Sequence, residues 1–238
     1  MYGITNMFVT SFYNIYNNQD RFFEYMTLFY DIAISGIPIV IFVDPCMVSK
    51  LRIFPKSVHV VGLSLEDCEI YRLAIAYTGE LPTGRTVVKD TKEFMGLMNC
   101  KPEFLKRAAV LFPADKYVWI DVGIMKIIKN PERCITKLHE IESNSFTKIT
   151  FGGCWSFGRP MNVDQIHWRV AGGMIVIPSI FVDEFYNHCK GVVRDFCSLP
   201  QYKLTWETNV WSIVELFAMK DNMQWYYCDH NDSLILNC

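Results

Sequence analysis

The sequence lacks the hallmarks of several protein classes. Its formal net charge is only −2, from 23 basic and 25 acidic residues among 238, so no overall positive charge favours nucleic acid or an anionic membrane as a partner. The longest nearly apolar stretch, residues 32–43, is interrupted by serine, glycine and proline and is shorter than the roughly 20 residues that span a bilayer. Residues 1–15 show no basic region followed by an apolar one, so we expect neither a secretory signal nor a transmembrane segment.

Paired cysteines and glycine-rich phosphate loops are also missing. The nine cysteines form no C-x-x-C pair and their number is odd, which argues against a disulfide framework and a structural zinc site. Free thiols fit a reducing compartment, so we expect a cytoplasmic protein. The sequence contains neither G-x-x-x-x-G-K-[ST] nor G-x-G-x-x-G after its first apolar run. A nucleotide bound here therefore needs another means of phosphate neutralisation, for which a divalent cation on oxygen ligands is the usual one.

What the sequence does contain is a regular alternation of apolar runs and amphipathic segments. The runs have no polar–apolar alternation, which is typical of strands covered by helices on both faces. They predict strands at residues 7–13, 37–45, 58–63, 117–120, 148–153, 169–178 and 223–229. Helices are predicted at 20–35, 65–77, 91–111 (one or two), 131–143, 179–190 and 206–219, with a loop at 78–90. The pattern indicates an α/β fold with a mostly parallel sheet, and no break in composition divides residues 1–238 into more than one domain.

An acidic residue directly follows two of the predicted strands, Asp44 after the second and Asp121 after the fourth. Ligands of open parallel sheets bind beyond the carboxyl ends of the strands, which places such carboxylates at a ligand crevice. Gly123, two residues after Asp121, leaves room for a ligand or metal to approach the backbone. The alternative is that Asp121 caps the short helix that follows.

The order of several segments resembles that of GT-A glycosyltransferases, and specifically the small HtrL/YibB-like branch found in bacteria and large DNA viruses. The matching segments are VTSFYNI, RFFEYMTLFYDIAISGIPIVIFVDP, NCKPEFLKRAA, YVWIDVGI, RVAGGMIVIP, TWETNVW and DHND, in this order over most of the chain. The resemblance implies a GT-A, Rossmann-like fold. It also implies transfer of a sugar from a nucleotide sugar, with a UDP-sugar expected, to a hydroxyl of a glycan or other acceptor.

The resemblance implies a metal site that this sequence carries in reduced form. In GT-A enzymes an Asp-x-Asp motif binds Mn²⁺ (or Mg²⁺) and the donor diphosphate, whereas this sequence reads Asp-Val-Gly, so only Asp121 carries over. A histidine near the C-terminus completes the metal shell in similar enzymes, which points to His230; imidazole suits such ions when oxygens fill the other positions. His230 could equally be a polar residue of a surface tail, and Asp229 or Asp232 could be the ligand instead.

The resemblance also implies a catalytic base. It places the acceptor-side acid at Glu207, near the start of an amphipathic helix for which Thr205 is a candidate cap. A carboxylate there would take the proton of the attacking hydroxyl in an inverting transfer, a contribution on the order of a hundredfold or more. The alternative is that Glu207 only complements the helix dipole.

A set of donor-binding residues is implied as well. Two of them, Gly172 and Gly173, interrupt a strand pattern, which indicates either the close approach of a ligand or a bulge at a sheet edge. Lys101 is either a donor-facing group, as the resemblance implies, or a solvated lysine at a helix end. The full set is Thr10, Ser11, Tyr13, Asp44, Asn99, Lys101, Asp121, Gly123, Gly172 and Gly173. Trp155, Trp168 and Trp206 offer flat faces for sugar C–H groups, or else are core residues.

Two other functions remain open on the sequence. A non-catalytic module that binds a sugar or a protein on the same fold is favoured by the missing second acid of the Asp-x-Asp motif. A sugar-nucleotide nucleotidyltransferase needs a basic, glycine-rich loop after the first strand. The segment TSFYNIYNNQDR contains no glycine and only one basic residue, Arg21, which counts against that function.

Overall fold

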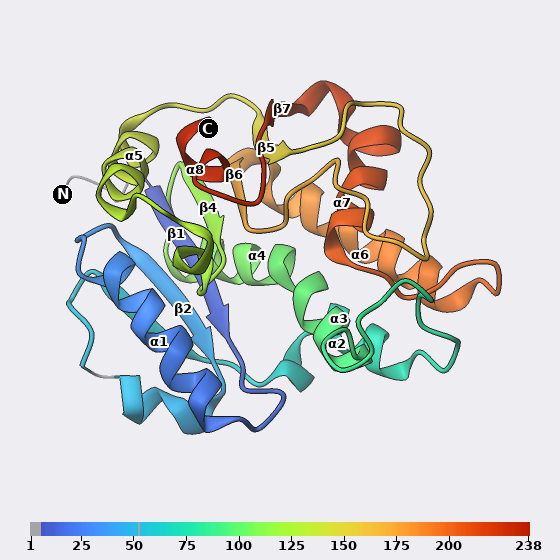
Figure 1. Ribbon diagram of the computed structural model, residues 1–238, viewed down its shortest axis with the longest axis horizontal. Coiled ribbons are helices and arrows are strands. Elements are labelled where there is room, and N and C mark those ends of the chain that lie inside the picture. The colour runs from blue at the N-terminus through green and yellow to red at the C-terminus, as the bar shows by residue number, and fades with distance from the viewer. Residues whose placement is uncertain (1–5, 52) are drawn as a thin grey trace.

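The computed structural model describes residues 6–51 and 53–238, and its seven described strands form one sheet in the order β3-β2-β1-β4-β6-β5-β7 (Figure 1). Strand β6 runs antiparallel to its neighbours β4 and β5, and the other four strand pairs are parallel. The strands are β1 (Asn6–Phe12), β2 (Ile39–Val43), β3 (Val58–Gly62), β4 (Lys116–Ile120), β5 (Ile149–Gly153), β6 (Met174–Pro178) and β7 (Met223–Tyr227). The predicted α/β fold with a mostly parallel, Rossmann-like sheet is confirmed.

Helices cover both faces of the sheet. Buried side chains of α1, α5 and α8 pack on one face, and those of α4, α6 and α7 pack on the other. The α-helices are α1 (Gln19–Ala33), α2 (Glu69–Ala76), α3 (Lys92–Asn99), α4 (Lys101–Leu111), α5 (Pro131–Ser143), α6 (Val182–Ser198), α7 (Glu207–Val214) and α8 (Ser233–Leu236). None of the described helices is both long and apolar enough to cross a membrane.

The two covered faces explain why the strands read as continuous apolar runs. Successive side chains of a strand point to opposite faces, and in β4 Tyr117 and Trp119 join the core under α4 and α6, while Val118 and Ile120 join the core under α1 and α5. All five residues of β4 are buried. Residues 117–120 are all apolar because each faces a helix layer, so the period-2 pattern of a half-exposed strand is absent.

Several element boundaries differ from the prediction, and three of them have a clear physical reason. Helix α1 is capped by Asn18, whose side chain accepts a hydrogen bond from the backbone N–H of Arg21. Helix α6 continues to Ser198 because Val193 and Phe196 still face the core. Strand β6 begins only at Met174, because residues 171–173 instead cross the ends of two strands, where Ala171 N–H donates to the Gly152 carbonyl and the Gly173 carbonyl accepts from Asp121 N–H.

Candidate active site

A cavity of about 1000 Å³ opens at the carboxyl-terminal edge of β1 and β4, at the upper end of the size range of small-molecule sites in proteins. It gathers most of the residues predicted from the sequence, although they come from five separate segments. Those that line it are Ser11, Tyr13, Asp121, Gly123, Gly172, Gly173, Glu207 and His230.

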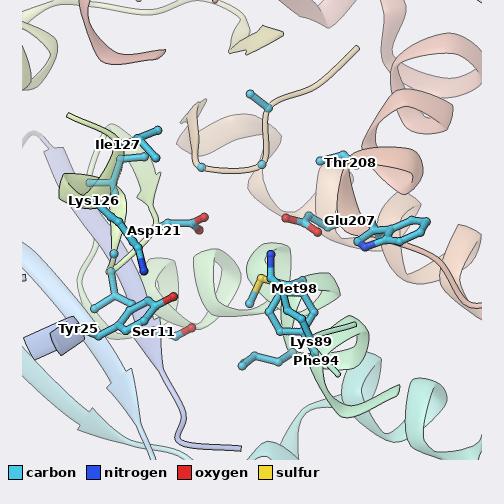
Figure 2. Close-up of a pocket in the computed structure, with 18 of the residues that line it drawn as sticks. Ser11, Tyr25, Lys89, Phe94, Met98, Asp121, Lys126, Ile127, Glu207 and Thr208 are labelled. Carbon is cyan, nitrogen blue, oxygen red and sulfur yellow. The ribbon is translucent and has the colours of Figure 1, made fainter. Parts of the chain in front are cut away.

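Two carboxylates face one another across this cavity (Figure 2). Asp121 directly follows β4, and Glu207 is the first residue of α7. Both bind the same ammonium group: Lys101 Nζ lies 2.9 Å from Asp121 Oδ1 and 2.8 Å from Glu207 Oε1. Lys101 is the first residue of α4 and is 1% exposed. A single buried cation therefore holds the two walls of the cavity at a fixed spacing.

The Lys101 ammonium has no donor to spare. Its third contact is a 2.8 Å hydrogen bond to the Gly172 carbonyl, so all three N–H groups are occupied. Burial alone lowers the pKa of Lys101, but Asp121 and Glu207 outweigh that effect and the pKa is raised above its usual value. The group is thus charged at neutral pH. The interpretation of Lys101 as a solvated lysine is wrong, and its side chain lies beneath the cavity wall rather than among the lining residues.

The Asp121 side chain does not cap the helical turn that follows it. That 3₁₀ turn, Ile124–Ile127, is preceded by Gly123 and has no side-chain cap. Instead Asp121 Oδ1 accepts from Trp119 Nε1 at 2.7 Å and from Lys101. Asp121 Oδ2 has no hydrogen-bond partner among residues 6–51 and 53–238, and the carboxylate points into the cavity (Figure 2). One oxygen is fixed by the protein and the other is left for a ligand.

Glu207 is held in a similar way. The helix-capping role considered for Thr205 is not observed, because its hydroxyl contacts the Val163 carbonyl and the Asn209 amide. Glu207 is only 7% exposed although it begins a helix, and dipole complementarity at a surface position does not require such burial. Its Oε1 is bound to Lys101, which leaves Oε2 as the oxygen without a protein partner in the described part of the chain.

Three glycines of the cavity wall are closely packed against side chains of other segments. A Cβ atom at Gly172 would lie 2.3 Å from Glu207 Oε1, and one at Gly123 would lie 2.6 Å from the Tyr25 ring. At Gly173 it would lie 2.9 Å from the side chain of Leu234. Gly172 and Gly173 precede β6 rather than forming a bulge within it.

The remaining residues of the predicted donor set lie outside the cavity lining. Asp44 accepts from the Cys46 N–H at 2.9 Å, in the turn after β2. Asn99 donates to the Met95 and Thr205 carbonyls. Thr10 is 0% exposed, and its hydroxyl has no hydrogen-bond partner in the described residues. Their proposed roles toward a donor stay predictions.

The two carboxylates considered as alternatives to His230 differ in their surroundings. Asp229 lines the cavity beside His230. Asp232 lies outside the lining, and its two oxygens accept from the backbone N–H groups of Lys129 and Asn130 ahead of α5. The His230 ring contacts the Trp168 ring, with centroids 6.4 Å apart, and makes no hydrogen bond within the described ranges.

The ligand atoms that face the cavity suit a hard divalent cation only in part. Asp121 Oδ2 and the His230 ring nitrogens have no partner among the described residues, and this mixed oxygen and nitrogen set fits Mn²⁺ or Mg²⁺ if a ligand supplies the other oxygens. Within the described residues, the group close enough for three side-chain ligands is Cys68, Cys100 and Glu103, which is buried and outside this cavity. Glu103 is also occupied there, since it accepts from two backbone N–H groups at the start of α2.

Three basic residues line the cavity although no sequence motif assigns them to a site. Lys89 belongs to the predicted loop 78–90, and its side chain extends toward the space between the two carboxylates (Figure 2). Arg21 lies over the Tyr16 ring, 4.5 Å from its centroid, and Lys126 pairs with Glu24 at 2.8 Å. Lys89 and Arg21 have no carboxylate partner in the part of the chain described. No local motif marks them, because their place depends on the path of the loop and of α1.

The chain is similar to known proteins in its fold and not in its sequence. No protein-family model and no curated protein matches the sequence, so the resemblance to the HtrL/YibB-like branch stays a prediction. One similar solved structure is a glycosyltransferase involved in the glycosylation of the major capsid of PBCV-1, with a TM-score of 0.47, 10% identity, and coverage of 94% of this chain and 81% of that one.

Two further similar solved structures are not named as glycosyltransferases. CMP:2-keto-3-deoxy-manno-octonic acid synthetase, complexed with CTP, has a TM-score of 0.49, 8% identity, and coverage of 94% and 90%. Bifunctional IspDF from Campylobacter jejuni has a TM-score of 0.45, 9% identity, and coverage of 95% and 50%. All three TM-scores are below 0.5, so these likenesses decide nothing about the reaction of this protein.

Proposed function

We propose that this protein is a GT-A-type glycosyltransferase that moves a sugar from a nucleotide-diphosphate sugar, a UDP-sugar in the first instance, to an acceptor hydroxyl with inversion. The observation that carries the proposal is the pair of opposed carboxylates, Asp121 and Glu207, held by Lys101 across one cavity at the carboxyl-terminal edge of the sheet. Such an edge is where ligands of Rossmann-like sheets bind. The pair provides one carboxylate for the donor, Asp121, and one for the acceptor, Glu207.

The Asp121 side of the cavity is suited to the donor diphosphate. Asp121 Oδ2 and His230 are the residues that would hold Mn²⁺ or Mg²⁺, an ion whose bound form offsets the charge of phosphate oxygens. Lys89 and Arg21, which have no carboxylate partner in the described ranges, bring two positive charges to the same cavity. These side chains bind and orient an anionic leaving group whether or not the shell of the ion is complete.

The Glu207 side is suited to the acceptor. Oε1 of Glu207 is fixed by Lys101, and Oε2 accepts the proton of the acceptor hydroxyl. The oxygen of that hydroxyl forms the new bond to the anomeric carbon of the donor sugar. The bond from that carbon to the diphosphate breaks, and its electron pair leaves with the nucleoside diphosphate. Attack from the face opposite the leaving group inverts the anomeric centre.

A second candidate function is a non-catalytic module that binds a sugar or a protein. One observation favours it: Gly123 stands where the second acid of an Asp-x-Asp motif would be, and the Tyr25 ring fills the space that a side chain there would need. The loss of that acid is therefore built into the packing of α1 against the end of β4.

A nucleotide-release assay separates the two functions. The protein is incubated with UDP-, GDP- and CDP-sugars, and free nucleotide is measured in Mn²⁺ and in EDTA. We expect slow release of nucleotide from one class of donor, because a transferase without acceptor passes some donor to water, and a marked loss of release in EDTA. Donor binding in calorimetry without any release would support a non-catalytic sugar-binding module, and the absence of both binding and release would contradict the transferase function.

Gly172→Ala is expected to lower donor hydrolysis and transfer by about a hundredfold while UDP binding changes little. The added methyl group would lie 2.3 Å from Glu207 Oε1 and must push the carboxylate away from Lys101, which removes the positioned base. Gly191→Ala in α6 is the matched control, because a Cβ there meets nothing within 4 Å, and it should keep full activity. Equal activities of the two variants would show that the Glu207 position is unimportant.

A further inference from the structure

The charged side chains of the cavity are unevenly distributed. Its lysine and arginine residues come from α1, from the 78–90 loop and from the 3₁₀ turn after β4. The opposite wall is built from residues 154, 166–173, 206–208 and 229–234, and its lining residues include two acids but no lysine or arginine. Away from His230, where a metal ion would be held, an anionic ligand is therefore disfavoured at this wall, which includes Glu207, and a neutral one is favoured.

This wall presents the ring of Trp168 with polar groups around it. Trp168, half-buried, lies beside the His230 ring at an interplanar angle of 60°, and Trp206 is 4% exposed with an indole N–H that has no hydrogen-bond partner in the described residues. Asp229 and Thr208 add a carboxylate and a hydroxyl to the same wall. A sugar ring has the complementary surface, since it combines an apolar C–H face with a rim of hydroxyl groups.

Three backbone N–H groups at this wall are already paired within the chain. Extended peptides bind by adding main-chain hydrogen bonds to a free edge. Here the Cys154 and Trp155 N–H groups both donate to the Trp168 carbonyl, and Ala171 N–H donates to the Gly152 carbonyl. These three N–H groups are therefore not free to pair with an extended peptide, whereas a compact sugar ring does not need them.

We infer that the wall around Trp168 is the acceptor subsite and that it takes an uncharged sugar ring stacked against Trp168, an inference that rests on the proposed transferase function. A ring held there lies beside Glu207, whose free oxygen can reach one of its hydroxyl groups. The acceptor is thereby assigned to carbohydrate chemistry, as opposed to a serine or threonine side chain of a protein.

Saturation-transfer NMR with a panel of neutral methyl glycosides (gluco, galacto, manno, xylo and fuco) tests this in the presence of UDP and Mn²⁺. We expect at least one glycoside to receive saturation at its ring C–H protons in the unmodified protein. Trp168→Ala and Trp168→Leu should each weaken its Kd by about threefold to tenfold, as expected for the loss of one aromatic contact. Trp168→Phe should keep most of the affinity. Tyr227→Ala removes an exposed aromatic ring outside the cavity and should leave the Kd unchanged.

Three results would overturn the inference: no binding of any glycoside to the unmodified protein, equal Kd values in the Trp168 and Tyr227 variants, or binding of a serine- and threonine-containing peptide in place of glycosides. UDP binding is measured by calorimetry on the same samples. Its persistence in the Trp168 variants shows that they are folded. Absence of UDP binding in the unmodified protein would contradict the transferase function. The glycoside titrations would still show whether the wall around Trp168 binds a sugar ring.

Discussion

Asp121→Asn is expected to abolish metal-dependent binding of UDP while the protein stays folded. In the native protein Asp121 Oδ2 is the oxygen free to bind an ion, and Oδ1 is tied to Trp119 and Lys101. The amide keeps an acceptor for Trp119 and the same volume, but it removes the negative charge that holds a divalent cation beside a diphosphate. We expect UDP affinity in Mn²⁺ to fall at least about a hundredfold, to the level seen in EDTA, in isothermal titration calorimetry.

The control for this experiment is Asp232→Asn. Asp232 belongs to the same C-terminal segment as His230 but accepts two backbone N–H groups ahead of α5 and lies outside the cavity. Its substitution is expected to lower stability by about 0.5–1 kcal/mol, as the weakening of a cap does, and to leave UDP binding intact. Metal-dependent UDP binding that survives in Asp121→Asn and disappears in Asp232→Asn would reverse the assignment of ligands.

Asp44 and Asp121 show how far local sequence reasoning reaches. Each acid follows a buried strand, and the residues around each give the same signal. The two carboxylates have different surroundings because of the strand order in the sheet. Strand β4 lies in the middle of the sheet between β1 and β6, whereas β2 lies one strand from the edge. The carboxylate after β2 turns to the N–H of Cys46 in the next 3₁₀ turn. Strand order depends on packing between distant segments, which no short motif records.

The strands, the helices α1 to α7 and the place of Asp121 at the end of a strand could be predicted because each is marked by residues close in sequence, whereas the role of Glu207 is implied only by the resemblance of the whole chain to GT-A glycosyltransferases. The apolar runs identify β1, β2 and β4, and the start of an amphipathic segment identifies α7. The ion cluster could not be predicted from such signals. Lys101 meets Asp121 from 20 residues away and Glu207 from 106 residues away, and only the packing of α4 between these segments brings the three groups together.

Lys89 illustrates the same limit for loops. The 78–90 segment was predicted correctly as a loop, yet nothing in its composition indicates that its lysine reaches a cavity. The loop is held across the cavity mouth by contacts to remote residues: the Tyr16 hydroxyl donates to the Lys89 carbonyl, and Gly84 N–H donates to the Asp164 carbonyl. Basic residues that a fold recruits in this way are found from structure alone.

Lys101→Met is expected to destabilise the protein by about 3–5 kcal/mol and to eliminate transfer activity. Removing the cation leaves two carboxylates facing each other, one of them only 7% exposed, and an uncompensated buried charge carries a cost of that size. Because the carboxylates raise the pKa of Lys101 above 10.5, the contribution of this group is complete at neutral pH and is lost only as the pH rises through the folded-state pKa. Urea unfolding at pH 7 measures the loss.

A double variant separates the structural role of Lys101 from its positioning role. Lys101→Met combined with Glu207→Gln should recover part of the lost stability, because one of the two unpaired charges is gone, and should remain inactive because the base is gone. Lys106→Met is the matched control: this lysine lies on the same helix, is paired at 3.2 Å with an Asp183 side chain that is 77% exposed, and should contribute less than about 1 kcal/mol. The prediction would be contradicted if the Lys101→Met protein were as stable as the Lys106→Met protein and still transferred sugar. Asp121 and Glu207 would then hold their positions without the ammonium group between them.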